Sequence, residues 1–108
     1  MKTLSIDTSS NICSLAILAD NKIIYEDYIA DKLTHSENLM PMIKKAFDNL
    51  TINLADIDLF TCSKGPGSFT GIRIGVATIC AFRDYYNKKA IGISSLEGLA
   101  YNLSLIHI

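Results

Sequence analysis

The chain has 108 residues, a formal net charge of −1 and 49% apolar residues. This length suits one small domain with its own core, and the apolar content argues against a disordered chain. The near-zero net charge gives no electrostatic signature of binding to nucleic acid or an anionic membrane, and no apolar run approaches the ~20 residues that span a bilayer. Three separated cysteines without a paired spacing indicate reduced core thiols of a cytoplasmic protein rather than a disulfide frame or a zinc site.

The first third of the chain reads as three strands, predicted over Lys2–Asp7, Ile12–Ala19 and Lys22–Ala30. Turn-forming residues follow the first strand, and Asp20-Asn21 makes a tight turn between the other two. Strands linked so closely are expected to pair as an antiparallel hairpin.

A helix follows the third strand. Thr34 and Glu37 have the spacing of a capping box, and apolar residues then recur at helical intervals as far as Leu50. Pro41 lies inside this pattern and removes one hydrogen bond. It is expected to kink the helix or to make its first turn a separate piece.

The remainder alternates between strand and helix. The predicted elements are a strand over Ile57–Cys62, a helix from Thr70 to about Tyr86 ended by Lys88-Lys89, a strand over Ala90–Ile93 and a last helix from Ser94 through Leu103. The order is β-β-β-α-β-α-β-α. It predicts an α/β fold whose mixed five-stranded sheet starts antiparallel and continues through parallel crossovers.

The helix from Thr70 to Tyr86 is apolar on two faces. One face is predicted to carry Ile72, Val76 and Ile79, and the opposite face Ile74, Ala77, Ala81 and Tyr85. A helix of this kind must be covered on both sides. The second cover is either the helix that ends at Leu50 or another chain.

A glycine-rich loop over residues 65–75 joins the fourth strand to this helix. Such a loop suits an anion such as phosphate, whereas the simpler interpretation, a tight turn packed on a neighbouring segment, is favoured. It matches neither the Walker A nor the dinucleotide pattern. Asp7 could hold a metal-bound water near a phosphate, although an Asx-turn is favoured. The candidate anion or nucleotide contacts are Asp7, Gly65, Gly67, Ser68 and Gly71.

No catalytic set is evident. His35 has Leu39, not a second histidine, at the position that a helical metal pair requires, so the residues predict no metal site. Ser68 lacks a nucleophile-elbow context, and no cofactor is predicted. Arg73 could clamp an anion or pair with a carboxylate of a facing helix, and these two interpretations are evenly balanced.

Four segments in register resemble a known family. They are Ile6-Asp7-Thr8-Ser9, the helix start His35-Ser36-Glu37-x-Leu39-x-Pro41, the Gly-Pro-Gly-Ser-Phe-Thr-Gly-x-Arg-x-Gly loop of residues 65–75, and the segment 92–100. Together they resemble the N-terminal half of the TsaB (YeaZ) family of tRNA threonylcarbamoyladenosine biosynthesis.

The resemblance implies a lobe of the actin, sugar-kinase and Hsp70 class, which is ribonuclease H-like. Residues 1–108 would form one N-terminal lobe, with the family's second lobe absent. It also implies a non-catalytic subunit of the tRNA threonylcarbamoyltransferase assembly. The catalytic relative TsaD carries a helical pair of metal-binding histidines, and Leu39 replaces the second of them here.

The implied partners are a TsaD-type catalytic homologue, a TsaE-type ATPase in the assembly, and a second copy of the chain when it is alone. tRNA would be held only indirectly, without a membrane. The interface residues implied are Leu39, Ile43, Phe69, Arg73, Ile74, Ala77, Ala81 and Tyr85. The alternative is an enzyme of the same fold class, either a nucleotide-binding phosphotransferase or ATPase, or a glycoprotease-like peptidase. Asp7 and the glycine loop support that alternative, and the missing histidine pair weakens it.

Overall fold

The computed structural model describes residues 1–9, 12–20, 22–30, 35–63 and 69–93. The candidate loop residues Gly65, Gly67 and Ser68 and the predicted helix from Ser94 to Leu103 lie outside these ranges. So does Thr34, the predicted helix cap.

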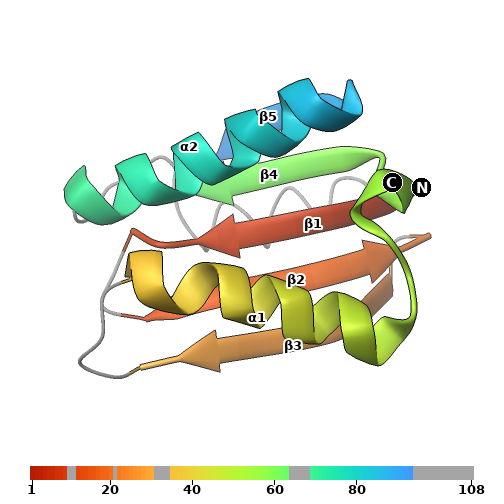
Figure 1. Ribbon diagram of the computed structural model, residues 1–108, viewed down its shortest axis with the longest axis horizontal. Coiled ribbons are helices and arrows are strands. Elements are labelled where there is room, and N and C mark those ends of the chain that lie inside the picture. Colours follow the sequence, from red (N-terminus) through yellow and green to blue (C-terminus); the bar gives the residue numbers. More distant parts are fainter. Residues whose placement is uncertain (10–11, 21, 31–34, 64–68, 94–108) are drawn as a thin grey trace.

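A mixed five-stranded sheet forms the centre of the fold, in the order β3-β2-β1-β4-β5 (Figure 1). Its strands are β1 (Lys2–Asp7), β2 (Cys13–Ala19), β3 (Lys22–Ile29), β4 (Leu59–Ser63) and β5 (Lys89–Ile93). β2 runs antiparallel to both of its neighbours, β1 and β3, and β4 and β5 continue from β1 in parallel. The predicted antiparallel start with parallel crossovers is therefore confirmed.

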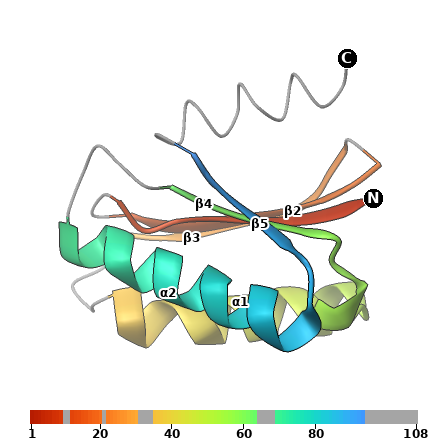
Figure 2. The same cartoon turned by 90° about the horizontal axis from the view of Figure 1, so that it is seen from above.

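Two long helices cover one face of the sheet, α1 (His35–Leu50) and α2 (Phe69–Tyr86) (Figure 2). In Figure 1, α1 lies in front of β2 and β3, while α2 lies in front of β5 and next to β4. Helix α1 connects β3 to β4, and α2 connects β4 to β5. A connection between parallel strands must cross from one end of the sheet to the other, and a helix usually does this. A short 3-10 helix, η1 (Leu54–Asp56), precedes β4 and was not predicted.

The core lies between the sheet and the helices. Leu4 and Ile6 of β1 stand beside Ile17 and Leu15 of β2, because side chains on paired strands alternate between the two faces. Cys13 of β2 also belongs to this layer. Strand β4 and helix α1 complete it with buried apolar side chains, among them Phe60, Cys62, Leu39, Met42, Ile43, Ala46 and Phe47. The exposed residues of α1 include Lys44, Lys45 and Asp48, as the helical period predicts.

Pro41 does not divide the first helix. The structure has one continuous α1 of 16 residues with Pro41 inside it, so the expectation of a separate first turn is wrong. Proline removes one backbone hydrogen bond, but the neighbouring residues Leu39, Met42 and Ile43 are buried in the core. That packing stabilises the helix through the proline, whose own side chain is exposed.

The second helix ends at a left-handed residue rather than at the predicted lysine pair. Asn87 has a φ of 55°, and the N–H of Lys88 donates to the carbonyl of Arg83 at 3.1 Å. These are features of a Schellman cap, in which asparagine can take the left-handed position that glycine usually fills. Lys89 already belongs to β5.

The fourth strand starts two residues later than predicted. Ile57 is fully buried, yet it follows η1, and its N–H donates to the carbonyl of Leu54 at 3.1 Å. A short apolar run alone does not separate a buried turn from the start of a strand.

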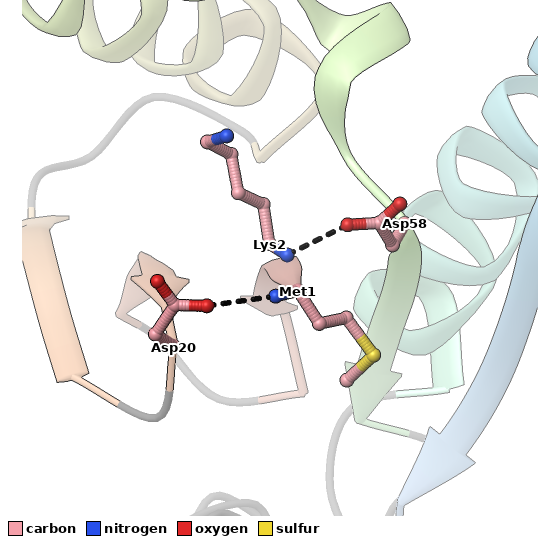
Figure 3. A network of polar contacts seen from close by, with 4 residues as sticks. All are labelled: Met1, Lys2, Asp20 and Asp58. Atoms are coloured by element: carbon pink, nitrogen blue, oxygen red, sulfur yellow. Dashed lines mark hydrogen bonds and ion pairs between the residues drawn. The ribbon is translucent and has the colours of Figure 1, made fainter.

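Main-chain and carboxylate contacts fix the start of β1 (Figure 3). The N–H of Lys2 donates to Asp58 Oδ2 at 2.8 Å, and the N–H of Asp58 donates back to the carbonyl of Lys2 at 2.8 Å. The amino group of Met1 pairs with Asp20 Oδ1 at 3.0 Å. The hydrogen bond from the Lys2 backbone holds the pKa of Asp58 below its ordinary value, and the amino terminus lowers that of Asp20.

Acid should therefore weaken the fold partly through Asp58. A carboxyl group whose pKa is lowered by folding stabilises the protein above its unfolded pKa of about 3.9, and this contribution is lost as the pH falls through the folded pKa. We expect Asp58→Asn to reduce stability at neutral pH and to flatten the decline below about pH 4. Urea unfolding at several pH values measures both effects. Asp48→Asn, at an exposed acid of α1, is the control, and equal acid sensitivity in Asp58→Asn and the parent would contradict the expectation.

Candidate functional site: the exposed face of helix α2

One side of α2 carries apolar and small side chains that this chain leaves in solvent. Ala77 and Ala81 are exposed, and Tyr85 is 82% exposed although it is large and aromatic. Residues at spacings of three or four lie on one side of a helix, so these three form a continuous surface. We call Ala77, Ala81 and Tyr85 the α2 surface.

The α2 surface is not covered by α1. Both helices lie on the same side of the sheet, but the three residues remain exposed in the complete fold. Of the two covers that the sequence left open, α1 is therefore excluded for these residues. Ile74 is half-buried and packs against the core at the border of the surface.

The side of α2 that faces the sheet differs from the prediction. Its buried residues are Gly71, Gly75 and Ile79, whereas Ile72 and Val76 are only half-buried beside them. The prediction differs from the structure because bulky apolar residues dominate the helical pattern of the sequence, whereas two of the three buried residues are glycines. Helix α2 comes closest to the sheet at Gly71 and Gly75, because glycine has no side chain to hold the two apart.

Two predicted interface residues of α1 are buried in this chain. Leu39 and Ile43 are each 1% exposed and belong to the core. They can reach a partner only if the core opens. Arg73 is exposed on α2, and the side chain of Phe69 lies outside the described part of the structure.

Asp7, Thr8 and Ser9 form a hydrogen-bonded turn at the end of β1. Asp7 Oδ1 accepts hydrogen bonds from the N–H of Ser9 at 2.8 Å and from Ser9 Oγ at 2.6 Å. The first of these bonds defines the Asx-turn that the sequence favoured for Asp7. Asp7 is 5% exposed, so this turn is buried. One of the two carboxylate oxygens of Asp7, Oδ1, is hydrogen-bonded within it.

Sequence reasoning overlooked a contact between this turn and α2. Thr8 Oγ1 donates to the carbonyl of Gly71 at 2.5 Å, across 63 positions of the chain. The signal that could have revealed it is Gly75, since a glycine inside a helix often marks a close approach by another segment. Residues 64–68 of the glycine loop lie outside the described part of the structure, so its favoured interpretation as a packed turn stays a prediction.

Charges near the α2 surface are sparse. Arg83 pairs with Asp84 at 2.9 Å on the exposed side of the helix, and this partner raises the pKa of the Arg83 guanidinium. Across the described ranges, no three His, Cys, Asp or Glu residues gather where a metal ion would need them. A search of the same ranges finds no helix with the length and apolarity to cross a membrane.

Comparison with known proteins places this architecture in a family. The family model described as "TsaD: tRNA N6-adenosine threonylcarbamoyltransferase" matches residues 28–107. The TsaB protein of Buchnera aphidicola subsp. Schizaphis graminum is 40% identical over 90% of this chain and 46% of its own length. YeaZ from Pseudomonas aeruginosa superposes with a TM-score of 0.81 at 27% identity, covering 86% of this chain and 43% of that one.

A more distant structure supports the fold alone. A Bacteroides thetaiotaomicron protein with an actin-like ATPase fold gives a TM-score of 0.58 at 8% identity, over 95% of this chain and 37% of that chain. The class is thus an actin-like α/β fold with a mixed sheet. Within it, the chain belongs to the TsaD family and, more narrowly, to the TsaB (YeaZ) proteins of tRNA threonylcarbamoyladenosine biosynthesis. The chain spans less than half the length of these relatives.

Proposed function

We propose that this chain is a non-catalytic subunit that binds a TsaD-type catalytic protein during threonylcarbamoylation of adenosine in tRNA. The observation that carries the proposal is the α2 surface, where Tyr85 is 82% exposed beside two alanines. Protein interfaces are enriched in large aromatic side chains, and small residues such as alanine let the backbones of two proteins pack closely.

The family relation supports the kind of partner. Relatives of this chain are named for threonylcarbamoyladenosine biosynthesis, and the matching family model describes the transferase itself. A partner built on the same fold would present an equivalent helix, and two helices can pack closely where small residues meet. The proposed interface consists of Arg73, Ile74, Ala77, Ala81 and Tyr85, continuing into Phe69.

A supporting rather than a catalytic role agrees with the chemistry of α1. Position 39, four residues after His35, is a leucine that lies in the core and has no ligand atom. The Asp7 carboxylate is engaged by Ser9 in the turn after β1. The same proposal includes homodimer formation in the absence of the partner and a TsaE-type ATPase in the assembly. It also includes indirect contact with tRNA and a cytoplasmic location.

Calorimetric titration of the chain into a TsaD-type catalytic protein tests this function. We expect one-to-one binding with a submicromolar Kd, and light scattering on each protein alone supplies their own oligomeric states. The rival enzyme function is tested in parallel by ATP hydrolysis of the chain and of Asp7→Ala. Turnover that Asp7→Ala abolishes, together with no binding by the folded chain, would replace the proposal with the enzyme.

A further inference from the structure

The turn after β1 is joined to the first turns of α2 by one buried side chain. Thr8 is 1% exposed, and its Oγ1 donates to the carbonyl of Gly71 at 2.5 Å. Gly71 is the third residue of α2, which starts at Phe69. A side chain of the sheet layer thus bonds directly to the helix that carries the α2 surface.

Gly75 makes room for this contact. A Cβ atom added to Gly75 would lie 2.6 Å from Thr8 Oγ1, a separation that real Cβ atoms essentially never show. The Ile6 side chain and Thr8 Cβ would lie at ordinary contact distances of 3.8 Å. Glycine is a poor helix former, so its presence inside α2 is accounted for by the hydroxyl that occupies the space of its missing side chain.

Thr8 is itself held in place. On one side of it Asp7 lies at the end of β1, paired with Ser14 of β2, and on the other side Ser9 donates two hydrogen bonds to Asp7 Oδ1. A short side chain fixed by its own turn offers little freedom to yield. The contact therefore limits how closely the first turns of α2 can approach the end of β1.

The α2 surface lies on the same helix as Gly75 and begins two residues after it, at Ala77. An α-helix of this length behaves as a rigid element, so a displacement at Gly71 and Gly75 is carried to Ala77, Ala81 and Tyr85. We infer that Thr8 and Gly75 are positioning residues that hold the α2 surface in the orientation a TsaD-type partner recognises. This inference rests on the proposed function.

Substitutions at the contact test it. Gly75→Ala is expected to weaken binding to a TsaD-type protein about tenfold in calorimetry, because a displaced helix lowers the fraction of molecules competent to bind. Thr8→Val, which keeps the shape but loses the donor, should act in the same direction. Thr8→Ser keeps the hydroxyl and should restore most of the affinity. Adding Thr8→Ala to Gly75→Ala removes the hydroxyl that the new Cβ meets, so the two changes should be non-additive in urea unfolding.

Thr61→Val is the matched control. Thr61 Oγ1 donates to Ser5 Oγ at 2.7 Å, which is another buried threonine hydrogen bond, between β1 and β4. Alternation along β4 places Thr61 on the face away from α2, since its neighbours Phe60 and Cys62 belong to the core beneath the helices. This variant should lose stability comparable to Thr8→Val without losing affinity.

A second readout does not depend on the partner. In the chain alone, amide NMR shifts in Thr8→Val and Gly75→Ala are expected to change along α2 as far as Tyr85, whereas Thr61→Val should leave that helix unchanged. Shifts confined to the neighbourhood of residues 71–75, or full affinity in both Thr8→Val and Gly75→Ala, would overturn the positioning role. Loss of binding in Ala81→Arg with these variants unaffected would leave the proposed function standing. If the parent does not bind at all, the proposed function fails and the NMR measurement alone decides the positioning of α2.

Discussion

Arginine in place of Ala77 or Ala81 is expected to abolish tight binding to a TsaD-type protein. Each alanine is exposed on α2 in the isolated chain, so the monomer should accept the substitution, and arginine is a good helix former. In a closely packed interface the guanidinium would be buried without a partner, a penalty of about 3–5 kcal/mol. That corresponds to a loss of affinity of roughly a hundredfold or more in calorimetry.

Two controls make this result specific. Ala30→Arg introduces the same side chain at an exposed position after β3, on the edge of the sheet away from β4 and β5, and should bind as the parent does. Ala81→Ser keeps a small side chain at the interface and should cost little. If Ala77→Arg and Ala81→Arg both bind with unchanged affinity, the α2 surface is not the contact.

Phe60→Ala is expected to produce the largest loss of stability. Phe60 is fully buried on β4, and its ring lies 5.6 Å from that of Phe82 on α2, between centroids. Truncating a buried phenylalanine usually lowers the free energy of unfolding by about 3–5 kcal/mol, because a cavity remains. Small domains have about 5–15 kcal/mol in total, so a large part of the stability should disappear.

Urea unfolding followed by circular dichroism measures that loss. Phe60→Leu retains most of the volume and should be affected less. Tyr85→Ala, at an exposed aromatic ring of α2, is the control and should change stability little, apart from its edge contact with Tyr86 at 4.8 Å. A loss below about 1 kcal/mol in Phe60→Ala would mean that β4 and α2 are not joined through this ring.

The sequence was sufficient for the sheet because its signals are local. The strand predicted over Lys2–Asp7 has the observed bounds, and the hairpin of β2 and β3 follows from alternation with a tight turn. Errors occurred where distant segments decide the structure. Packing of its neighbours in the core keeps Pro41 within one helix. The error at Ile57 is local instead, because a buried turn and the start of a strand give the same short apolar run.

The candidate site also has a part that the sequence could predict and a part that it could not. The exposed part of α2 was predicted from helical spacing, since Ala77, Ala81 and Tyr85 do share one side of the helix. Leu39 and Ile43 are implied as interface residues by the family resemblance, which assigns α1 to the contact, but both are buried in the core of this chain. The bond between Thr8 and Gly71 joins residues 63 positions apart, and no local pattern encodes it.

The three cysteine thiols can report on local unfolding of the protein. Cys13 on β2 and Cys62 on β4 are buried in the core, while Cys80 on α2 is partly exposed. A thiol-reactive probe should therefore modify Cys80 in the native state and reach the other two only when the sheet separates from its helices. The labelling rates of Cys13 and Cys62 would then measure, under native conditions and without denaturant, how often each half of the sheet comes apart.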